Sequence, residues 1–357
     1  MKLRVGILGA TGAVGQKFVK LLDGHPWFEV TALAASERSA GKPYHLAAHW
    51  LEDTPIPPKT AQIIVQNAET DLLDCDFVFS GLDASVAGEV EERYARAGYP
   101  VISNAKNFRM HATVPLLIPE VNADHLTLID RQDWGSSGFI VTNPNCASVG
   151  ITLALKPLYD AFGIETVMAT TLQALSGAGY PGVPSLDAVA NVVPFIGGEE
   201  DKVETEPLKL LGKLSSIGVE PAQIGISAQC TRVPVIEGHL ATVSVKLTAS
   251  NVPLSAVLKA IASFKADSEI ARLPSSPDRV LDYAPDNAFP QPRRHSQAGK
   301  GMTVSIGRVR ECPVLDFKLV CLAHNTIRGA AGGALLNAEL LAARGKLKHR
   351  SELQGFA

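Results

Sequence analysis

The stretch Leu3-Arg4-Val5-Gly6-Ile7-Leu8-Gly9-Ala10-Thr11-Gly12-Ala13-Val14-Gly15 decides the fold. Its apolar first half predicts a buried strand, and the spacing of Phe18, Val19 and Leu22 behind it predicts a helix. Glycines at a strand-to-helix turn permit a tight bend and the close approach of a pyrophosphate, whose charge the helix N-terminus meets. A plain tight turn is the alternative. The position directly after the first strand favours a dinucleotide-binding turn.

The alternation of strands and helices continues to about residue 145. Short apolar runs recur at Val30–Leu33, Phe77–Phe79, Val101–Ile102 and Phe139–Val141, with helical segments between them. Such alternation is typical of a Rossmann-like, doubly wound parallel sheet in an α/β fold. We therefore predict a nucleotide-binding domain over residues 1–145.

The pattern changes after Cys146. Thr166–Gln173, Leu240–Leu247 and Met302–Val309 are longer, β-branched runs without a helix between each pair of them. They predict a second, α+β domain over residues 146–324, built on a mostly antiparallel sheet.

The end of the chain is rich in Ala, Gly and Leu, especially over Gly329–Ala343. Small side chains let a helix pack closely against another element. We therefore expect the C-terminal helical segment, 325–357, to return to the first domain and complete it.

Composition excludes several classes of function. The chain has 357 residues, 46% of them apolar and 19% charged, and its net charge of −3 gives no sign of a nucleic-acid-binding surface. Its five cysteines are odd in number and free of any C-x-x-C pair, which favours neither a disulfide framework nor a zinc site. The start of the chain lacks a basic leader, and no stretch reaches the ~18 apolar residues of a membrane span. We expect a cytoplasmic protein with no metal and no membrane role.

A single cysteine stands at the junction of the two halves. Asn143-Pro144-Asn145-Cys146 follows a predicted strand and precedes one face of a predicted helix, marked by Ile151, Leu155, Leu158 and Phe162. Cys146 therefore sits in a strand-to-helix turn, where free backbone N–H groups and the helix dipole favour the nucleophilic thiolate. A small buried apolar side chain is the alternative.

A nucleotide domain followed by such a cysteine suggests hydride transfer at a carbonyl carbon held as a thioester, which requires a proton donor and acceptor. His239 follows a strand and a Gly turn and directly precedes another strand. A structural histidine is the usual alternative, and His324 is a rival. Arg109, Lys202 and Arg232 are the candidate anion-binding cations. Surface charge is the alternative for each of them, and it is weakest for Arg232, which stands beside the apolar Val233-Pro234-Val235.

The end of the second predicted strand indicates which dinucleotide is bound. The sequence there is Ser36-Glu37-Arg38-Ser39-Ala40-Gly41-Lys42. Its hydroxyls and cations suit a 2′-phosphate and favour NADP, whereas Glu37 keeps NAD open. A solvated polar turn is the alternative for any one of these residues.

The motifs of the chain also form a recognisable series. GATGAVG, SNAKNFR, TNPNC, QALSGAGYPGVPSLD, GEED-K, RVPVIEGH and HNTIRGAAGGALLNAEL follow one another between residues 9 and 340. Together they closely resemble the aspartate-β-semialdehyde dehydrogenases of the archaeal and fungal type. The likeness covers nearly the whole chain, and its longer motifs are far more specific than a glycine loop.

This resemblance implies the NADP-dependent reductive dephosphorylation of 4-phospho-L-aspartate to L-aspartate 4-semialdehyde, in the biosynthesis of lysine, threonine and methionine. It implies a Cys thioester, with Cys146 as nucleophile and His239 as acid/base. It also implies a homodimer or homotetramer, with contacts formed by the second domain.

The resemblance extends to individual binding residues. Arg109 and Lys202 would bind phosphate, Arg232 the substrate carboxylate, and Glu199, rather than its neighbour Glu200, the ammonium. Gln173 would also hold the substrate. The cofactor would contact Gly9, Thr11, Gly12, Ala13, Val14, Ser36, Arg38, Ser39, Ser176, Gly177 and Asn325.

Three other functions compete with this one. Malonyl-CoA reductase resembles the same family and shares the cysteine and histidine, but its substrate has no ammonium, so Glu199 and Lys202 count against it. N-acetyl-glutamyl-phosphate reductase is disfavoured by the detailed motif match. A nucleotide-sensing protein that kept the fold and lost the chemistry is disfavoured by the joint presence of nucleophile, base and anion ligands.

Overall fold

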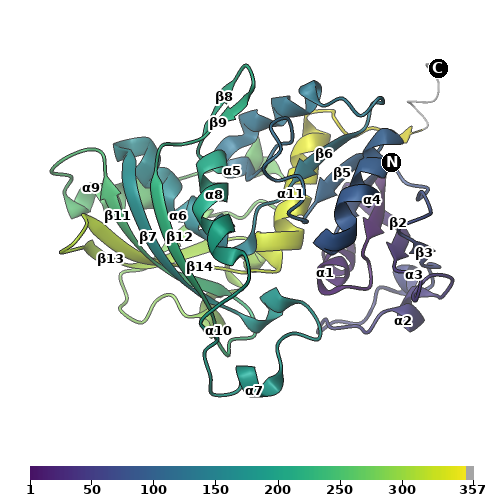
Figure 1. Cartoon of the computed structure of the whole chain (residues 1–357), viewed down its shortest axis with the longest axis horizontal. Coiled ribbons are helices and arrows are strands. Elements are labelled where there is room, and N and C mark those ends of the chain that lie inside the picture. The colour runs from purple at the N-terminus through teal and green to yellow at the C-terminus, as the bar shows by residue number, and fades with distance from the viewer. Residues whose placement is uncertain (351–357) are drawn as a thin grey trace.

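Two six-stranded sheets organise the chain in this computed structural model, which describes residues 1–350 (Figure 1). In the first sheet every neighbouring pair is parallel. The spatial order is β3 (Gln66–Asn67), β2 (Phe28–Ala35), β1 (Leu3–Leu8), β4 (Phe77–Ser80), β5 (Pro100–Ser103) and β6 (Phe139–Thr142). This is the strand order of the Rossmann fold, and it confirms the predicted doubly wound sheet.

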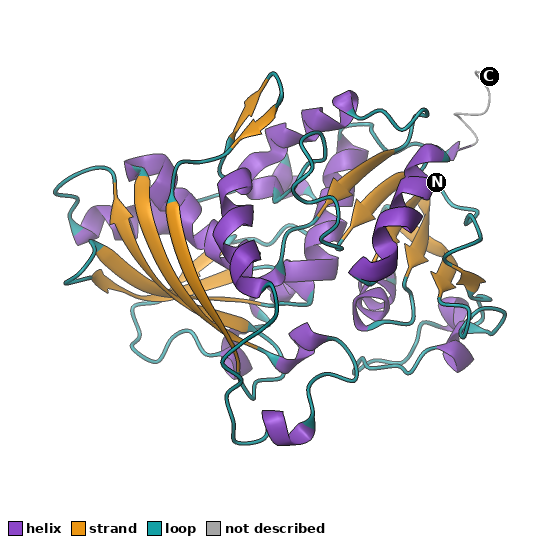
Figure 2. Ribbon diagram, viewed as in Figure 1, coloured by secondary structure: helices purple, strands orange, loops and turns teal. Residues whose placement is uncertain are grey.

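Helices cover both faces of the first sheet (Figure 2). Val5 and Ile7 of β1 face a core shared with α1 (Ala13–Leu22) and α11 (Gly332–Ala343). Leu8 faces the opposite core, which α4 (Ala84–Arg96) covers. Because successive side chains of a strand point to opposite faces, a strand buried on both sides is apolar throughout. That explains the unbroken apolar runs of the sequence.

The smaller elements of the first half were not predicted. Strand β3 is a polar edge strand of two residues, so it leaves no apolar run. The short helical segments are α2 (Tyr44–Ala47), α3 (Pro58–Ala61), α5 (Pro119–Asn122) and η1 (Ala123–Arg131).

The second sheet has the order β10 (Gly225–Arg232), β7 (Ile164–Gln173), β11 (His239–Leu247), β14 (Phe317–Ala323), β13 (Val304–Glu311) and β12 (Leu281–Tyr283). Its central pairs are antiparallel, whereas the pairs β10/β7 and β13/β12 at its edges are parallel. The predicted mostly antiparallel sheet is therefore confirmed, with parallel edges that the sequence did not suggest.

Helices α6 (Cys146–Phe162) and α9 (Leu254–Ser263) pack on one face of the second sheet, and α8 (Glu199–Leu210) packs beside β10. Among residues 1–350, no helix packs on the other face (Figure 1). The remaining elements are η2 (Leu175–Ala178), α7 (Ser185–Ala188), the hairpin β8 (Lys213–Ser215) and β9 (Gly218–Glu220), η3 (Ile270–Arg272), α10 (Pro292–His295) and η4 (Ala298–Gly301).

The C-terminal helix lies in the core of the first sheet. A π-helical turn, η5 (Ile327–Ala331), precedes α11, whose residues from Gly332 to Leu341 are all buried. Leu335 and Leu336 share a core with Phe18 of α1. The last part of the expected helical segment, residues 351–357, lies outside the described residues.

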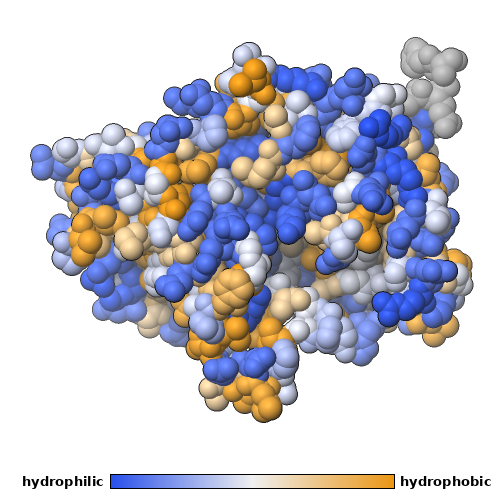
Figure 3. Space-filling model, viewed as in Figure 1, coloured by the Kyte–Doolittle hydropathy of each residue, from blue (hydrophilic) through white to orange (hydrophobic). Residues whose placement is uncertain are grey.

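The face of the molecule seen in Figure 3 is mostly polar, with an apolar area over the loop around α7. Leu186 is 88% exposed there, and Val189 and Phe195 are also exposed. Within residues 1–350, no helix has both the length and the apolar character needed to cross a membrane.

Candidate active site

Cys146 is the first residue of α6, at the strand-to-helix turn that the sequence predicts. The Asn145 side chain caps the helix by accepting from the N–H groups of Ala147 and Ser148. Gly329 of η5 lies against the cysteine, since a Cβ added there would fall 2.7 Å from the Cβ of Cys146. The nucleophile candidate is thus fixed by a helix cap on one side and a close backbone on the other.

His239 faces this cysteine. Its Nε2 lies 3.2 Å from Sγ of Cys146, and His239 is the first residue of β11. The backbone N–H of Ala174 donates to Nδ1 of the same ring over 3.0 Å. Because Nδ1 accepts, the neutral ring must carry its proton on Nε2. His239 therefore presents an N–H to the sulfur.

Burial controls the protonation of this pair. It raises the pKa of the Cys146 thiol to about 12, and the carboxylate of Glu199 acts in the same direction. Burial and then the nearby Arg232 lower the pKa of His239 to about 3. Both shifts favour a neutral thiol and a neutral imidazole in the free protein. Burial thus opposes the thiolate that the helix N-terminus favours, and the thiolate of the helix turn stays a prediction.

Adjacent strand ends supply two of the expected substrate residues. Gln173 ends β7 and Arg232 ends β10, and they are paired in the parallel register of these strands. Both are buried, and Arg232 donates to the carbonyl of Ala174 over 2.8 Å. The C-terminal ends of β7 and β10 thereby bring an amide and a guanidinium to the end of the sheet at which β11 begins with His239.

Glu199 is the centre of the polar network beside Cys146. Its carboxylate accepts from Nδ2 of Asn145 at 2.9 and 3.0 Å and from Nε2 of Gln173 at 3.1 Å. Nζ of Lys202, one turn along α8, lies 2.6 Å away. Despite burial, these donors hold the pKa of Glu199 below its usual value. The carboxylate is therefore ionised and already surrounded by donors.

Glu200 points elsewhere, toward the sheet edge, where it accepts from the backbone N–H of Cys230 over 3.1 Å. The structure thus separates the two neighbouring carboxylates that the sequence leaves side by side. Of the two, Glu199 is the one that lies among Asn145, Gln173 and Lys202.

Arg109 is more enclosed than expected of an anion ligand. Its NH1 donates to Glu206 over 2.8 Å and its NH2 to the carbonyl of Asn104 over 2.7 Å. Its charge still acts on Cys146, as do those of Lys202 and Arg232. The charges of three cations therefore act on the sulfur, and Glu199 is the anion whose charge opposes them.

The glycine turn fits a dinucleotide. Gly9 has a positive φ of 74°, and a Cβ added to Gly15 would lie 2.2 Å from the carbonyl oxygen of Gly9. Helix α1 starts at Ala13, and its N-cap Gly12 has no side chain to cover the first-turn N–H groups, which therefore suit a phosphate. Thr11, Ala13 and Val14 lie in this turn, half exposed.

The predicted 2′-phosphate residues lie just past β2. Ser36 and Arg38 are exposed and Ser39 is half exposed in a turn that follows Ala35. An exposed guanidinium beside two hydroxyls suits a phosphate monoester. These residues therefore fit NADP.

The remaining residues expected to contact the cofactor, Ser176, Gly177 and Asn325, lie close to His239 and Arg232. Asn325 donates to the hydroxyl of Ser176 over 2.8 Å and accepts from the N–H of Gly238 over 2.8 Å. A Cβ added to Gly177 would come within 2.9 Å of both Arg232 and His239. The segment at η2 thus lies close to Arg232 and His239.

His324, the rival histidine, takes no part in the cysteine pair. It is fully buried, and its Nε2 lies 3.1 Å from Glu237 and 3.0 Å from Gln297.

Sequence reasoning missed Asn145, Glu206 and the N–H of Ala174 as parts of the site. Glu206 follows Lys202 by four residues, so the helical period could have placed it on the same face. The backbone donor leaves no trace in the sequence.

The comparisons with known proteins agree with this geometry. Residues 4–129 match the model of the semialdehyde dehydrogenase NAD-binding domain, and residues 155–328 match that of the semialdehyde dehydrogenase dimerisation domain. These matches define the class of protein as semialdehyde dehydrogenase.

Proteins that are similar in sequence and structure identify the family within this class. The aspartate-semialdehyde dehydrogenase of Archaeoglobus fulgidus is 48% identical over 96% of this chain and 98% of its own length. That of Cryptococcus neoformans is 46% identical over 97% and 99%. The crystal structure of aspartate semialdehyde dehydrogenase with NADP from Candida albicans superposes with a TM-score of 0.89 at 41% identity, covering 97% of this chain and 100% of that one. The chain belongs to the aspartate-semialdehyde dehydrogenase family.

Proposed function

We propose that this protein catalyses the NADP-dependent reductive dephosphorylation of 4-phospho-L-aspartate to L-aspartate 4-semialdehyde, a step in lysine, threonine and methionine biosynthesis. The observation that supports this most directly is the 3.2 Å contact between Cys146 and His239, surrounded by Glu199, Lys202 and Arg232. The site thus combines a sulfur nucleophile, an imidazole N–H donor, one carboxylate and two cationic side chains.

The first chemical step is attack of the Cys146 sulfur on the acyl carbon. A C–S bond forms, and the bond between the acyl carbon and the phosphate oxygen breaks. The thiol proton passes to the departing phosphate, which leaves as hydrogen phosphate. Arg109 and Lys202 stabilise the departing charge, which cations do most effectively in a buried site. The product on the enzyme is a thioester of Cys146.

The second step reduces the thioester. NADPH, when bound at the glycine turn and the Ser36, Arg38 and Ser39 turn, supplies the hydride. The Nε2–H of His239 donates a hydrogen bond to the charge that develops first on the carbonyl oxygen and then on the sulfur, and a proton from solvent restores the Cys146 thiol. One such donor is worth about 10²–10³ in rate. For the ring to accept a proton instead, Nδ1 must give up its bond from Ala174.

Substrate selection follows from the charged groups. Arg232 binds the carboxylate, Glu199 the ammonium, and Gln173 donates to the bound substrate. A site built for these groups rejects an analogue that leaves them unpaired. Malonyl-CoA has no ammonium for Glu199, so it should be a poor substrate.

A direct assay tests this function. The purified protein is given aspartate semialdehyde, phosphate and NADP, and NADPH formation is followed by absorbance. A parallel assay supplies malonyl-CoA and NADPH. Phosphate-dependent oxidation of the semialdehyde with little reduction of malonyl-CoA is expected, and the reverse pattern would assign the protein to the rival activity.

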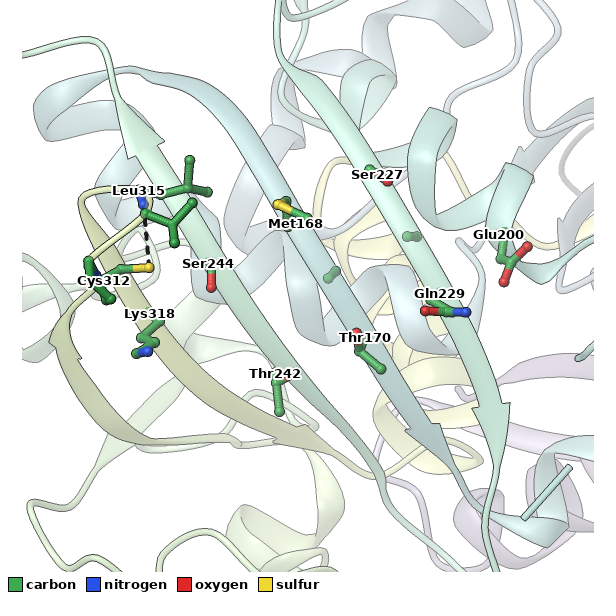
Figure 4. A pocket seen from close by; sticks show the side chains of 14 residues that line it. Met168, Thr170, Glu200, Ser227, Gln229, Thr242, Ser244, Cys312, Leu315 and Lys318 are labelled. Atoms are coloured by element: carbon green, nitrogen blue, oxygen red, sulfur yellow. Dashed lines mark hydrogen bonds between the residues drawn. The ribbon is translucent and has the colours of Figure 1, made fainter. Parts of the chain in front are cut away.

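We further propose that the uncovered face of the second sheet forms a homodimer contact. Figure 4 shows Met168, Thr170, Gln229 and Thr242 on neighbouring strands of this face, in a hollow of about 670 Å³. Met168 is 53% exposed, which is unusual for a strand methionine that no partner covers. The match to a dimerisation domain supports the same assignment.

The dimer contact is tested with Thr242→Arg, which places a charge in the middle of this face. Analytical ultracentrifugation should show a smaller species than the wild type. Thr70→Arg, on an exposed turn of the first domain, is the control and should leave the mass unchanged. Equal masses for Thr242→Arg and wild type would exclude this face, and the wild-type mass itself distinguishes a dimer from a tetramer.

The remaining parts of the proposal concern organisation. We assign residues 1–145 and the C-terminal segment from 325 to the NADP-binding domain, because α11 shares the core of the first sheet. Residues 146–324 form the catalytic and dimerisation domain.

The proposed location is the cytoplasm. The five cysteines are all free thiols, which suits a reducing compartment.

A further inference from the structure

One face of helix α8 is lined by alternating charges. Glu199, Lys202, Glu206 and Lys209 follow one another at helical spacing, and all but Lys202 are buried. The proposed roles of Glu199 and Lys202 in substrate binding leave the buried Glu206 and Lys209 without a function.

Glu206 joins two parts of the site. Its Oε1 accepts from NH1 of Arg109 over 2.8 Å, and its Oε2 accepts from the backbone N–H of Asn145 over 2.6 Å. The side chains of Arg109 and Glu206 are only 9% and 3% exposed. A single carboxylate therefore connects the guanidinium near Cys146 to the turn that holds Cys146.

Arg109 has few other partners to fix it. NH2 donates to the carbonyl of Asn104, while Nε is buried without a hydrogen-bond partner within the described residues. Nζ of Lys209 donates to the carbonyls of Arg109, His111 and Val114 at 2.7 to 2.8 Å, which holds the loop backbone. The backbone is thus anchored by Lys209, and the guanidinium is oriented by Glu206.

We propose that Glu206 is the positioning residue of the phosphate site, holding the Arg109 guanidinium and the Asn145 amide in one fixed relation to Cys146. This inference rests on the proposed function, because it assumes that Arg109 meets the phosphate. The carboxylate of Glu206 is occupied by Arg109 and the Asn145 N–H, so Glu206 acts through them and is not assigned a contact with substrate or cofactor.

The physical reason is the cost of an unpaired buried charge. Without the carboxylate, the guanidinium would have to turn toward Glu199 or solvent to recover a partner, and the Asn145 N–H would lose its acceptor. Either movement displaces the phosphate-binding donors while leaving the glycine turn and Arg232 in place. Phosphate binding should therefore suffer selectively.

The test is Glu206→Gln, which keeps the shape and one acceptor oxygen but removes the charge. In the oxidative direction its KM for phosphate should rise about tenfold, since a charge-assisted bond is lost. The KM values for semialdehyde and NADP should stay within about twofold of wild type, because their ligands do not touch Glu206. Asp201→Asn, an exposed carboxylate on the same helix, is the matched control and should change nothing.

A double-mutant cycle separates positioning from a general structural effect. If Glu206 acts through Arg109, Glu206→Gln should add less than about a twofold change in phosphate KM when Arg109 is already alanine. Glu206→Asp, which keeps the charge, repeats the cycle if the Gln variant does not fold, and its KM for phosphate should rise less.

Two results would overturn the proposal: a wild-type KM for phosphate in the folded Glu206 variants, or the same increase with and without Arg109. A different result would contradict the proposed function rather than the role of Glu206. In that case the wild type itself shows no phosphate-dependent oxidation of the semialdehyde.

Discussion

The backbone N–H of Ala174 donates to Nδ1 of His239, 3.0 Å away, and so decides which ring nitrogen carries the proton. Ala174 directly follows Gln173, the last residue of β7, and β7 is the neighbour of β11, which begins with His239. The sheet geometry that brings Gln173 to the site therefore also sets the His239 tautomer. With Nε2–H directed at Cys146, the ring is prepared to stabilise negative charge on sulfur or oxygen.

The burial of His239 predicts a pH dependence of stability. Its pKa in the folded state is lowered from 6.5 to about 3 by burial and then by Arg232. Below pH 6.5 the unfolded ring takes up a proton and the folded ring does not, so this residue's contribution to the free energy of unfolding falls by about 1.4 kcal/mol per pH unit. The loss should end near the folded pKa.

Urea denaturation of wild type and His239→Gln at pH 7.5 and pH 5 measures this effect. The wild type should lose about 2 kcal/mol more than the variant over this interval, because only it carries the buried ring. His111→Gln, at an exposed position, should behave as wild type. Equal losses in wild type and His239→Gln would show that the ring is not held neutral by the fold.

Replacement of the nucleophile gives a second prediction. Cys146→Ser is nearly isosteric, and the hydroxyl has no base beside it because Nε2 of His239 carries a proton. Turnover should fall to background while the thermal unfolding midpoint remains close to wild type. Cys312→Ser, on the second domain away from the pair, should stay active. Substantial activity in Cys146→Ser would rule out the thioester.

Arg38 should select NADP over NAD. Arg38→Ala should weaken NADP by about 1–3 kcal/mol, the value of a charge-assisted bond to phosphate, and NAD much less. Fluorescence titration with both cofactors measures the difference. Lys59→Ala removes another exposed cation from the same domain and should alter neither affinity. An equal loss for NADP and NAD would make Arg38 a structural residue.

The fold was predictable because its main signals are local. The apolar runs of β1, β4, β5 and β6 are buried on both faces, so they are continuous in the sequence. Strand β3 was not predictable, since its two polar residues pair only at the sheet edge. The parallel pairing of β10 with β7 is likewise set by tertiary packing.

The site was predictable to the extent that motifs mark it. The turn of Cys146 and the strand start of His239 could be placed, but their protonation could not, because it depends on burial by residues far apart in sequence. The partner of Arg109 was also hidden, since Glu206 lies 97 positions away.

The charged residues around Cys146 give the prediction that best tests the substrate assignment. Lys202→Ala should raise the KM for phosphate, because Nζ of Lys202 lies 2.6 Å from Glu199 and its charge acts on the Cys146 sulfur. Arg232→Ala should instead raise the KM for the semialdehyde, because the guanidinium at the end of β10 is the proposed carboxylate ligand. Each increase should be about tenfold or more, the value of one charge-assisted bond, while NADP affinity stays unchanged. Steady-state kinetics with each substrate varied in turn measures all three constants. Lys213→Ala, an exposed lysine in β8, is the control. If Lys202→Ala and Arg232→Ala raised the same KM, or neither raised any, the separate phosphate and carboxylate positions would be wrong.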